Sequence, residues 1–583
     1  MTSAPWKDDQ LATILRGIAP PILAASTILS TKALLPVGIP YLKGLGQSFG
    51  YAFELGRYAA KVGITHVPLA TLANPAALIP AVTIIGGALT ALATVFAIAP
   101  LLRSEVYGNA RWATPRDLRR QALRAPAGMA LGEAHGKILR PEKRRHIGVL
   151  APTRSGKTAG VAVPSMLDFP GTIIAVSSKN DLRRITEPHR SKLGPTYTIQ
   201  WADPRTPNAW NFFGRQMLSD DDAALERYTA QIAAQFWPEL TGEGEYFQSN
   251  ARRLAQVLFH FHALEARAFG GNVDVPGMVS DLLSFDVEPE EDTGRNKKKK
   301  NDKDKKEEDP FGTHLLRIAA MSDIRGYPSR ISENLSQWAH MHPKERSQHL
   351  TTILTGLNFL TFIAVKEATS RCDFTFADLR DRPTTVYIEF PQSDKGAFGM
   401  LTAQFYNALI NWGLDNPAGV SGQPILLIFD EFRSLPKMTA FPDLHTSGAG
   451  QGLIAMVIVQ HPAILREKYG PEVAKEIISN WDYTVAFAFN ESEAQEEMAK
   501  IVGQFTAHKK TSSGALFKPM QQTLTEAEEG RQLLRPEQWG AIPFGYHVIL
   551  TKGHKTRPIY AKTCLYRGHH RYGSMVPHLA DIE

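Results

Sequence analysis

Cysteine is nearly absent from this chain. The 583 residues include two cysteines, Cys372 and Cys564, which lie far apart in the sequence. The chain therefore has no Cys-x-x-Cys pair, no cysteine-based zinc site and no disulfide framework. This scarcity indicates a reducing compartment, or a membrane protein whose main part faces one.

An excess of either charge is also missing. Lysine and arginine total 65 against 58 aspartates and glutamates, which gives a net charge of +7. Over this length the excess permits contact with nucleic acid but does not by itself predict it. The length suits two domains, or one large α/β domain with an insertion.

Charged residues are absent from residue 74 to residue 102. This apolar stretch exceeds the ~20 residues that a helix needs to cross a bilayer, and we predict a span at about 76–102. A basic flank follows it, comprising Arg103, Arg111, Arg116, Arg119, Arg120 and Arg124. By the positive-inside rule, this flank places the rest of the chain in the cytoplasm.

An earlier apolar stretch, predicted as a span at about 11–35, is interrupted by Pro20, Pro21 and Lys32. It is also compatible with a signal peptide, because residues 24–26 (Ala-Ala-Ser) resemble a cleavage site. We favour a first span, since two crossings put both ends of the chain inside. Residues of about 36–74 then form a short extracytoplasmic segment.

A phosphate-binding loop is predicted after an apolar run that ends at Leu150. Backbone N–H groups of such a loop, and the helix N-terminus behind it, bind phosphate. Lys157 is expected to reach the outer phosphates and Thr158 to bind Mg²⁺, so that the cofactors are ATP and Mg²⁺. The predicted binding residues are Ala151, Pro152, Thr153, Arg154, Ser155, Gly156, Lys157 and Thr158.

This loop lacks the first glycine of the GxxxxGK[ST] pattern, whose place Ala151 takes. Alanine substitutes for glycine at little cost unless the position needs a positive φ. The alternative interpretation is an ordinary strand-to-helix turn, in which Gly156 only allows the backbone to turn and Lys157 is solvated.

Two carboxylates follow the apolar run Ile425 to Phe429. A buried strand that delivers Asp430 and Glu431 in this way is the Walker B arrangement. We predict that Asp430 holds Mg²⁺ and that Glu431 polarises the attacking water. The run from Leu453 ends in Gln460, which is predicted to contact the attacking water or the γ-phosphate, although a plain polar strand end is the alternative.

Strand and helix signals alternate around these motifs, which predicts a parallel sheet with crossover helices. The further strands are expected at 171–176, 197–199, 384–390 and 547–550, and a helix is expected at 396–414. Between about 213 and 372 the strand signals vanish. Apolar residues recur there at intervals of three and four, as expected for helices. Phe247, Ala251, Leu254, Val257, Leu258 and Phe261 form the first such face.

A charged run at 288–310 interrupts this helical region. It has no large apolar side chain, so we predict a disordered loop. Its lysine block is largely neutralised by neighbouring acids, which favours a solvated linker over a binding segment.

Two motifs carry a resemblance to a known family. Residues 108–113 (Gly-Asn-Ala-Arg-Trp-Ala) follow the second predicted span, and residues 152–157 (Pro-Thr-Arg-Ser-Gly-Lys) lie in the phosphate loop. Together they resemble the type IV secretion coupling proteins, the TraG-type ATPases of conjugation. The resemblance implies a RecA-like P-loop domain in two parts, 106–212 and 373–583, with an all-α insertion at 213–372.

The same resemblance implies a homo-hexameric, multi-pass protein of the bacterial inner membrane with a cytoplasmic motor domain. Its implied partners are the type IV secretion channel components, a relaxase–DNA complex or effector proteins, and the lipid bilayer. ATP hydrolysis would deliver the cargo to the channel.

Three other functions stay open. One is a chromosome-type, FtsK-like double-stranded DNA translocase, and a second is a docking platform that no longer hydrolyses nucleotide. An ABC-type transporter ATPase ranks last, because no ABC signature lies between the two Walker elements. No arginine finger is assigned, and Arg433 and Arg154 are only candidates.

The C-terminal part is basic and contains interspersed tyrosines. It comprises Lys509, Lys510, Lys552, Lys555, Arg557, Lys562, Arg567 and Arg571, with Tyr560, Tyr566 and Tyr572. Such a surface suits a nucleic-acid channel, although a solvated face is the ordinary interpretation of each residue. His554, His569 and His570 lack the spacing of a metal site.

Overall fold

The computed structural model describes residues 106–177, 181–239, 242, 244–285, 309–419, 422–513, 523–553 and 556–577. The predicted membrane spans at 11–35 and 76–102, and the charged run up to residue 308, lie outside these residues. Among the described residues, none of the helices combines the length and the apolar composition that a bilayer crossing requires. The chain divides into two units, and the description below concerns the second, Gly108–Glu583.

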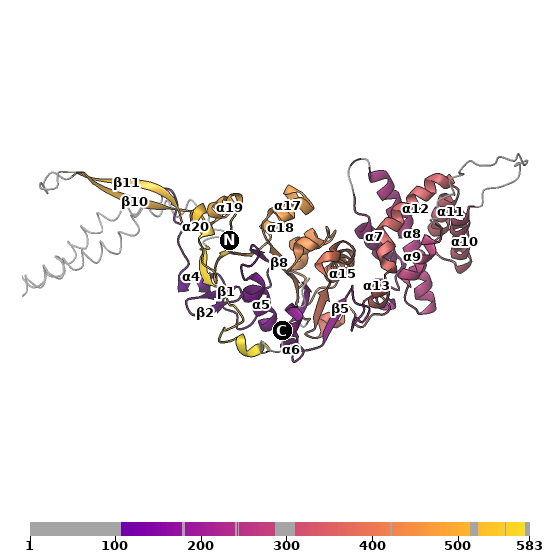
Figure 1. The fold of residues 1–583 in the computed structure, drawn as a ribbon, viewed down its shortest axis with the longest axis horizontal. Helices are drawn as coiled ribbons and strands as arrows, with labels where there is room; N and C mark the ends of the chain where they lie inside the picture. The colour runs from indigo at the N-terminus through magenta and orange to yellow at the C-terminus, as the bar shows by residue number, and fades with distance from the viewer. Residues whose placement is uncertain are drawn as a thin grey trace, which may run out of the picture. The chain divides into compact units, whose positions relative to one another are not determined.

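An eleven-stranded sheet forms the centre of this unit, in the order β2-β1-β13-β12-β9-β3-β8-β7-β4-β6-β5 (Figure 1). The strands are β1 Gly132–Ala134, β2 Lys137–Leu139, β3 Ile147–Leu150, β4 Thr172–Ser177, β5 Thr196–Gln200, β6 Thr385–Glu389, β7 Ile425–Phe429, β8 Leu453–Val459, β9 Tyr483–Ala486, β12 Tyr546–Thr551 and β13 Ile559–Lys562. All neighbours from β9 to β5 pair in parallel. This confirms the predicted α/β class.

The sheet is nevertheless mixed, because β12, β13, β1 and β2 pair antiparallel at one edge. A short connection explains one of these antiparallel pairs, β1 with β2. His135 and Gly136 join β1 to β2 and both have positive φ, 50° and 67°. A two-residue turn of this kind matches the twist of a hairpin and returns the chain antiparallel.

The central strands are buried on both faces. Every residue of β3, β4, β6, β7 and β8 is buried, as expected for a parallel sheet covered by helices. Successive residues of β7 point to opposite faces: Leu427 belongs to one apolar cluster, and Leu426 and Ile428 belong to the other. The sheet therefore separates two cores.

Helices from different parts of the chain cover the two faces. On one face α5 (Val163–Asp168) and α6 (Asp181–Arg190) contribute to the apolar cluster. On the other face lie α15 (Lys395–Asp415), α17 (Ala463–Tyr469), α18 (Pro471–Ser479), α19 (Ser492–Val502) and α20 (Pro536–Gly540). The helix predicted at 396–414 is α15.

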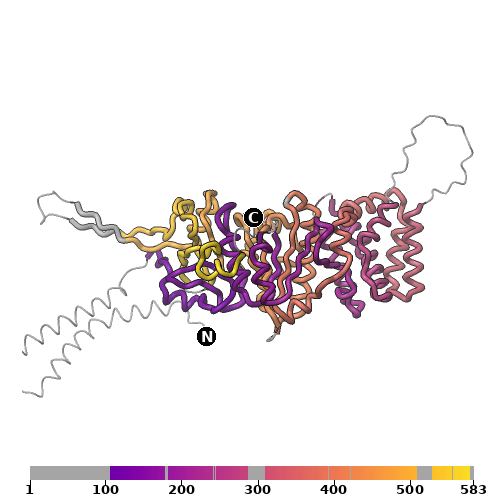
Figure 2. The backbone as a smooth tube through the Cα atoms, turned by 60° about the horizontal axis from the view of Figure 1, so that its bottom comes forward, coloured from indigo at the N-terminus to yellow at the C-terminus, as the bar shows by residue number. Residues whose placement is uncertain are grey.

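The described residues between β5 and β6 contain helices and no strands. The main helices are α7 Asp222–Phe236, α8 Glu245–Phe269, α9 Val275–Leu283, α10 Pro310–Arg325, α11 Ser329–Ala339, α12 Pro343–Leu357, α13 Ile363–Ala368 and α14 Asp378–Asp381. Most of them lie beyond the β5 edge of the sheet, as Figures 1 and 2 show. Of the face predicted in α8, Ala251, Leu254, Leu258 and Phe261 are buried, whereas Val257 is half-buried and Phe247 is exposed.

The prediction of a loop through residue 310 is wrong at its end. Asp309 caps α10, since its carboxylate accepts a hydrogen bond from the Gly312 N–H at 2.9 Å, and Pro310 is the first helical residue. Aspartate before proline is a strong helix start.

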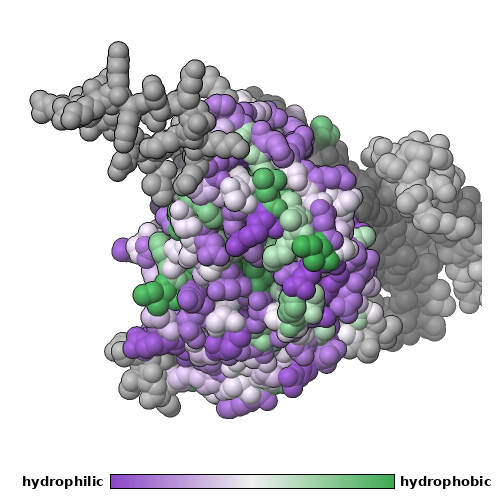
Figure 3. Space-filling model, turned by 90° about the vertical axis from the view of Figure 1, so that its right-hand side faces the viewer, coloured by the Kyte–Doolittle hydropathy of each residue, from purple (hydrophilic) through white to green (hydrophobic). Residues whose placement is uncertain are grey.

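Figure 3 shows the surface at the end of the unit where the helices between β5 and β6 lie, and there hydrophobic side chains lie at separate points among hydrophilic ones.

The 108–113 motif packs against the start of strand β10. Gly108 has φ +126°, and a Cβ there would lie 2.5 Å from the Gln504 carbonyl oxygen. The Ala110 N–H donates to that oxygen at 2.9 Å. Gln504 opens β10 (Gln504–Ser513), which pairs with β11 (Thr523–Gln532) in a separate hairpin. After the motif, Thr114 and Pro115 begin α4 (Pro115–Arg120).

Two histidines are buried together beneath the central strands. The rings of His146 and His445 lie 5.0 Å apart, and each residue is at most 3% exposed. His146 Nδ1 accepts a hydrogen bond from the Ala455 N–H of β8 at 3.1 Å. Burial lowers the pKa of His146 to about 4 and that of His445 to about 3. Both rings are therefore neutral in the folded protein near pH 7.

This burial predicts a loss of stability in mild acid. An unfolded histidine has a pKa near 6.5, so below that pH the unfolded chain binds more protons than the folded chain. The free energy of unfolding then falls as pH drops from about 6.5 toward 4. We expect His445→Phe to reduce the slope of unfolding free energy against pH by up to ~1.4 kcal/mol per pH unit.

The slope is measured by denaturant titration between pH 6.5 and pH 5. His340→Gln is the control, because His340 is exposed and should leave the slope unchanged. An unchanged slope in His445→Phe would contradict the assignment.

Candidate nucleotide-binding site

The predicted site residues meet at the carboxyl edge of three neighbouring parallel strands. The phosphate loop follows β3, Gln460 follows β8, and Asp430 follows β7. Leu150 pairs with Val459, and Phe429 pairs with Val457. Strand β8 thus lies between the two Walker strands, at the edge where open α/β sheets bind ligands.

The loop conformation explains why Ala151 replaces glycine. Ala151 is fully buried, and its N–H donates to the Val459 carbonyl at 3.0 Å. Its φ is not positive, whereas Gly156 has φ +86° and Arg154 has φ +62°. The glycine that the backbone requires is Gly156, so Ala151 leaves the loop geometry intact.

The helix behind the loop starts at Lys157 with a π-helical turn, Thr158–Ala162, and continues as α5. The Gly160 N–H donates to the Gly156 carbonyl at 2.8 Å. Pro152, Ser155, Lys157 and Thr158 are half-buried, while Thr153 and Arg154 are exposed. A helix N-terminus behind a half-buried lysine favours a bound anion.

Thr158 and Asp430 are in direct contact. The Thr158 hydroxyl lies 2.9 Å from Asp430 Oδ1 and 3.1 Å from Oδ2. Asp430 is 8% exposed. Glu431 and Gln460 are half-buried. Glu431 precedes the short helical turn Phe432–Ser434.

These residues fit Mg²⁺ and a phosphate chain. A hydroxyl and a carboxylate are hard oxygen ligands, and Mg²⁺ is usually held by one or two carboxylates together with substrate phosphates. Ser155 Oγ in the loop is buried and has no hydrogen-bond partner among the described residues. A phosphate oxygen would supply that partner.

Comparison with known proteins assigns the family. Residues 111–578 match the family described as "Type IV secretory system Conjugative DNA transfer", which covers most of the chain. The chain belongs to this family. The match confirms the resemblance that residues 108–113 and the phosphate loop carry.

Relatives in this family are about a quarter identical to the chain over the residues that align. Protein VirD4 of Rhizobium rhizogenes is 25% identical over 489 residues, which cover 78% of this chain and 65% of that protein. Protein VirD4 of Agrobacterium fabrum is 26% identical, covering 77% and 64%. Conjugal transfer protein TraG of Escherichia coli is 24% identical, covering 75% and 71%. The chain thus spans slightly less than two thirds of the VirD4 proteins.

Solved structures of the bacterial conjugative coupling protein TrwB share the fold. The unbound form superposes with a TM-score of 0.54 at 16% identity, and the match covers 79% of this chain and 93% of that one. A TrwB structure with ADP and Mg²⁺ gives a TM-score of 0.52 at 16% identity, covering 78% and 93%.

Like the rest of the site, the far end of the phosphate-loop helix is fixed by side chains distant in sequence. Asp168, the last residue of α5, accepts hydrogen bonds from Arg140, from Arg571 at 2.6 Å and from the Tyr572 hydroxyl at 3.0 Å. The bond to Asp168 raises the pKa of Arg571. The carboxylate is almost fully buried, with 2% of its side chain exposed. Sequence analysis missed this residue, because one aspartate at a helix end carries no local signal.

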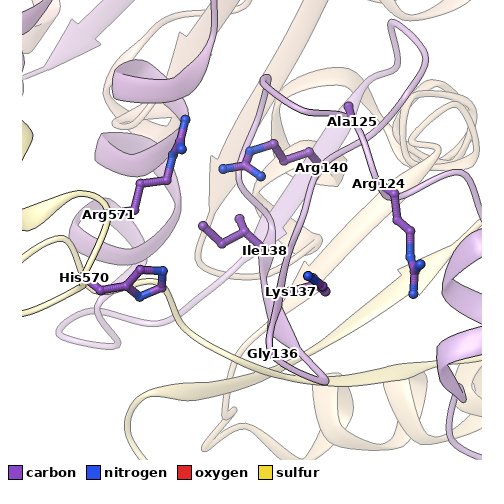
Figure 4. A pocket seen from close by; sticks show the side chains of 8 residues that line it. All are labelled: Arg124, Ala125, Gly136, Lys137, Ile138, Arg140, His570 and Arg571. Carbon is purple, nitrogen blue, oxygen red and sulfur yellow. The ribbon is translucent and has the colours of Figure 1, made fainter.

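Figure 4 shows the hollow beside β2 where these arginines meet. Arg140 points toward Arg571, and Lys137 and His570 line the same hollow. Arg571, from the basic C-terminal part, therefore serves as an internal anchor. Tyr566 and Tyr572 are 4% and 0% exposed, so they belong to the core and are not free to stack on bases.

Removing the Asp168 charge should destabilise the fold. Asp168→Asn leaves two arginines without their carboxylate, and loss of one partner of a buried ion pair costs ~3–5 kcal/mol. We expect a clear drop in the free energy of unfolding, measured by denaturant titration. Asp203→Asn is the control, because its pair with Arg205 is at the surface and such pairs contribute little to stability. Equal effects of the two changes would argue against the anchor.

Restoring the missing glycine should bring no gain. Ala151→Gly adds backbone freedom to the unfolded chain, so we expect a loss of ~0.4–1 kcal/mol in stability. Affinity for ATP, measured by calorimetry with Mg²⁺, should change less than about twofold, because the loop does not need a positive φ there. A tenfold tighter complex would show that the alanine limits the site.

Proposed function

We propose that this chain is a P-loop ATPase that couples ATP hydrolysis to DNA transfer through a type IV secretion channel. The observation that carries the proposal is the contact between the Thr158 hydroxyl and both carboxylate oxygens of Asp430. The two Walker motifs meet there, 272 residues apart in sequence. Membership of the conjugative DNA transfer family supports the cargo class.

Each site residue has a chemical role in this proposal. The 151–158 loop binds the phosphates through its N–H groups, and Lys157 neutralises the outer phosphates. Thr158 and Asp430 would hold Mg²⁺, which when bound offsets the negative charge of the phosphates. Glu431 orients and polarises the attacking water, and Gln460 donates a hydrogen bond to that water or to the γ-phosphate. TrwB structures with an ATP analogue and with ADP and Mg²⁺ support this ligand class.

The wider arrangement belongs to the same proposal. The motor domain comprises 106–212 and 373–583, with a helical insertion at 213–372 that contacts cargo. The spans at 11–35 and 76–102 anchor it to the inner membrane, and six copies form the ring. The partners are the channel components and a relaxase–DNA complex, with effector proteins as the other cargo. Support comes from the family match, from the apolar runs and from the helices between β5 and β6.

The roles of Lys157 and Glu431 are separable by experiment. Lys157→Ala should abolish ATP binding. Glu431→Gln should keep binding but slow hydrolysis by ~10²–10⁴-fold, the usual contribution of a general base. Binding is measured by calorimetry and hydrolysis by phosphate release. Glu472→Gln is the control, since Glu472 is exposed on α18 and should leave both unchanged.

Transfer assays in cells identify the cargo and test the alternatives. Loss of plasmid transfer in Lys157→Ala supports the motor, and loss of protein delivery alone identifies effector cargo. Normal transfer with Lys157→Ala would contradict the motor and favour a docking platform. Hydrolysis that is strongly stimulated by duplex DNA, without need of a channel, would favour a chromosome-type translocase.

A further inference from the structure

An exposed aromatic ring lies directly against the phosphate loop. Phe544 is 70% exposed and sits in the turn between α20 and β12. A Cβ built on Gly156 would lie 3.4 Å from Phe544 Cε2 and 3.3 Å from Leu565 Cδ2. Single exposed apolar residues are common on protein surfaces. This ring differs from them because its edge lies beside Gly156 of the predicted phosphate loop.

Backbone hydrogen bonds hold this ring and its neighbour in place. The Tyr546 N–H donates to the Pro543 carbonyl at 3.1 Å, which closes the turn that carries Phe544. The Thr563 N–H donates to the Gly545 carbonyl at 2.7 Å, and the Tyr566 N–H donates to the Ala159 carbonyl at 3.0 Å. The turn and the segment carrying Leu565 are thereby fixed to the start of the phosphate-loop helix.

The helix that follows the loop packs tightly against the same segment. A Cβ on Gly160 would lie 2.0 Å from Thr563 Cγ2 and 3.5 Å from Leu565 Cδ2. Phe544 and Leu565 thus form an apolar surface at the point where the loop turns into the helix. This surface adjoins Gly156, so a nucleotide whose phosphates occupied the loop would have it within reach.

We propose that Phe544, supported by Leu565, is the platform on which the nucleotide base stacks. The inference rests on the proposed function, because it concerns the same site. A phenyl ring has a π-face and no hydrogen-bonding group, so it stacks on any base. It should favour the larger purine rings while making little distinction between adenine and guanine.

The test compares ligands with and without a base. Wild type and Phe544→Ala are titrated by calorimetry with ATP, GTP and inorganic tripolyphosphate, each with Mg²⁺. Phe544→Ala should weaken ATP and GTP by about 5- to 150-fold, equivalent to ~1–3 kcal/mol, the usual effect of losing one base–aromatic stack. Binding of tripolyphosphate should stay unchanged, and Phe544→Tyr should restore ATP binding.

Two controls separate stacking from a structural effect. Phe269→Ala removes another exposed phenylalanine, 63% exposed at the end of α8, and should change no affinity. Thermal unfolding of Phe544→Ala should match wild type, since the ring is mostly exposed.

The outcomes distinguish this inference from the proposed function. Equal weakening of ATP and tripolyphosphate in Phe544→Ala would show that the ring only shapes the loop, and would overturn the inference. Unchanged ATP affinity in Phe544→Ala would overturn it while leaving the nucleotide site in place. Wild-type protein that binds neither ATP nor tripolyphosphate would overturn both.

Discussion

Parallel pairing of β3, β8 and β7 is the constraint on which the site depends. Each strand is buried on both faces, so its backbone groups must be satisfied by its neighbours. The register then fixes where each strand ends. Because the three strands are parallel, the residues that follow them all lie at the same edge of the sheet. Thr158 reaches Asp430 because one hydrogen-bonded ladder, with β8 between them, sets their separation.

The C-terminal part of the chain completes the site. Its backbone binds Ala159 at the start of the phosphate-loop helix, and Arg571 and Tyr572 bind Asp168 at the end. Three members of the basic C-terminal part, Arg571, Tyr566 and Tyr572, thus supply internal contacts, whereas Lys552, Lys562 and Arg567 stay exposed.

Local patterns predicted the central elements well. Runs such as Ile425 to Phe429 are apolar on both faces, which few structures other than buried strands require. The strands β1, β2, β9 and β13 were missed because each has only three or four residues and, unlike the equally short β3, includes polar side chains. The β10–β11 hairpin was missed because its strands are polar, and Glu-Ala-Glu-Glu within β11 is a helix-favouring sequence.

By itself, the sequence determined the α/β class, the phosphate loop, the two carboxylates and the helical region between the halves of the sheet. These features depend on spacing and composition within short windows. Only the tertiary structure decided the mixed edge of the sheet, the Asp168 anchor, the burial of Tyr566 and Tyr572, and the place of Phe544 beside Gly156. Those features depend on contacts between residues that are mostly hundreds of positions apart. A local sequence pattern does not indicate which distant residue a side chain will contact.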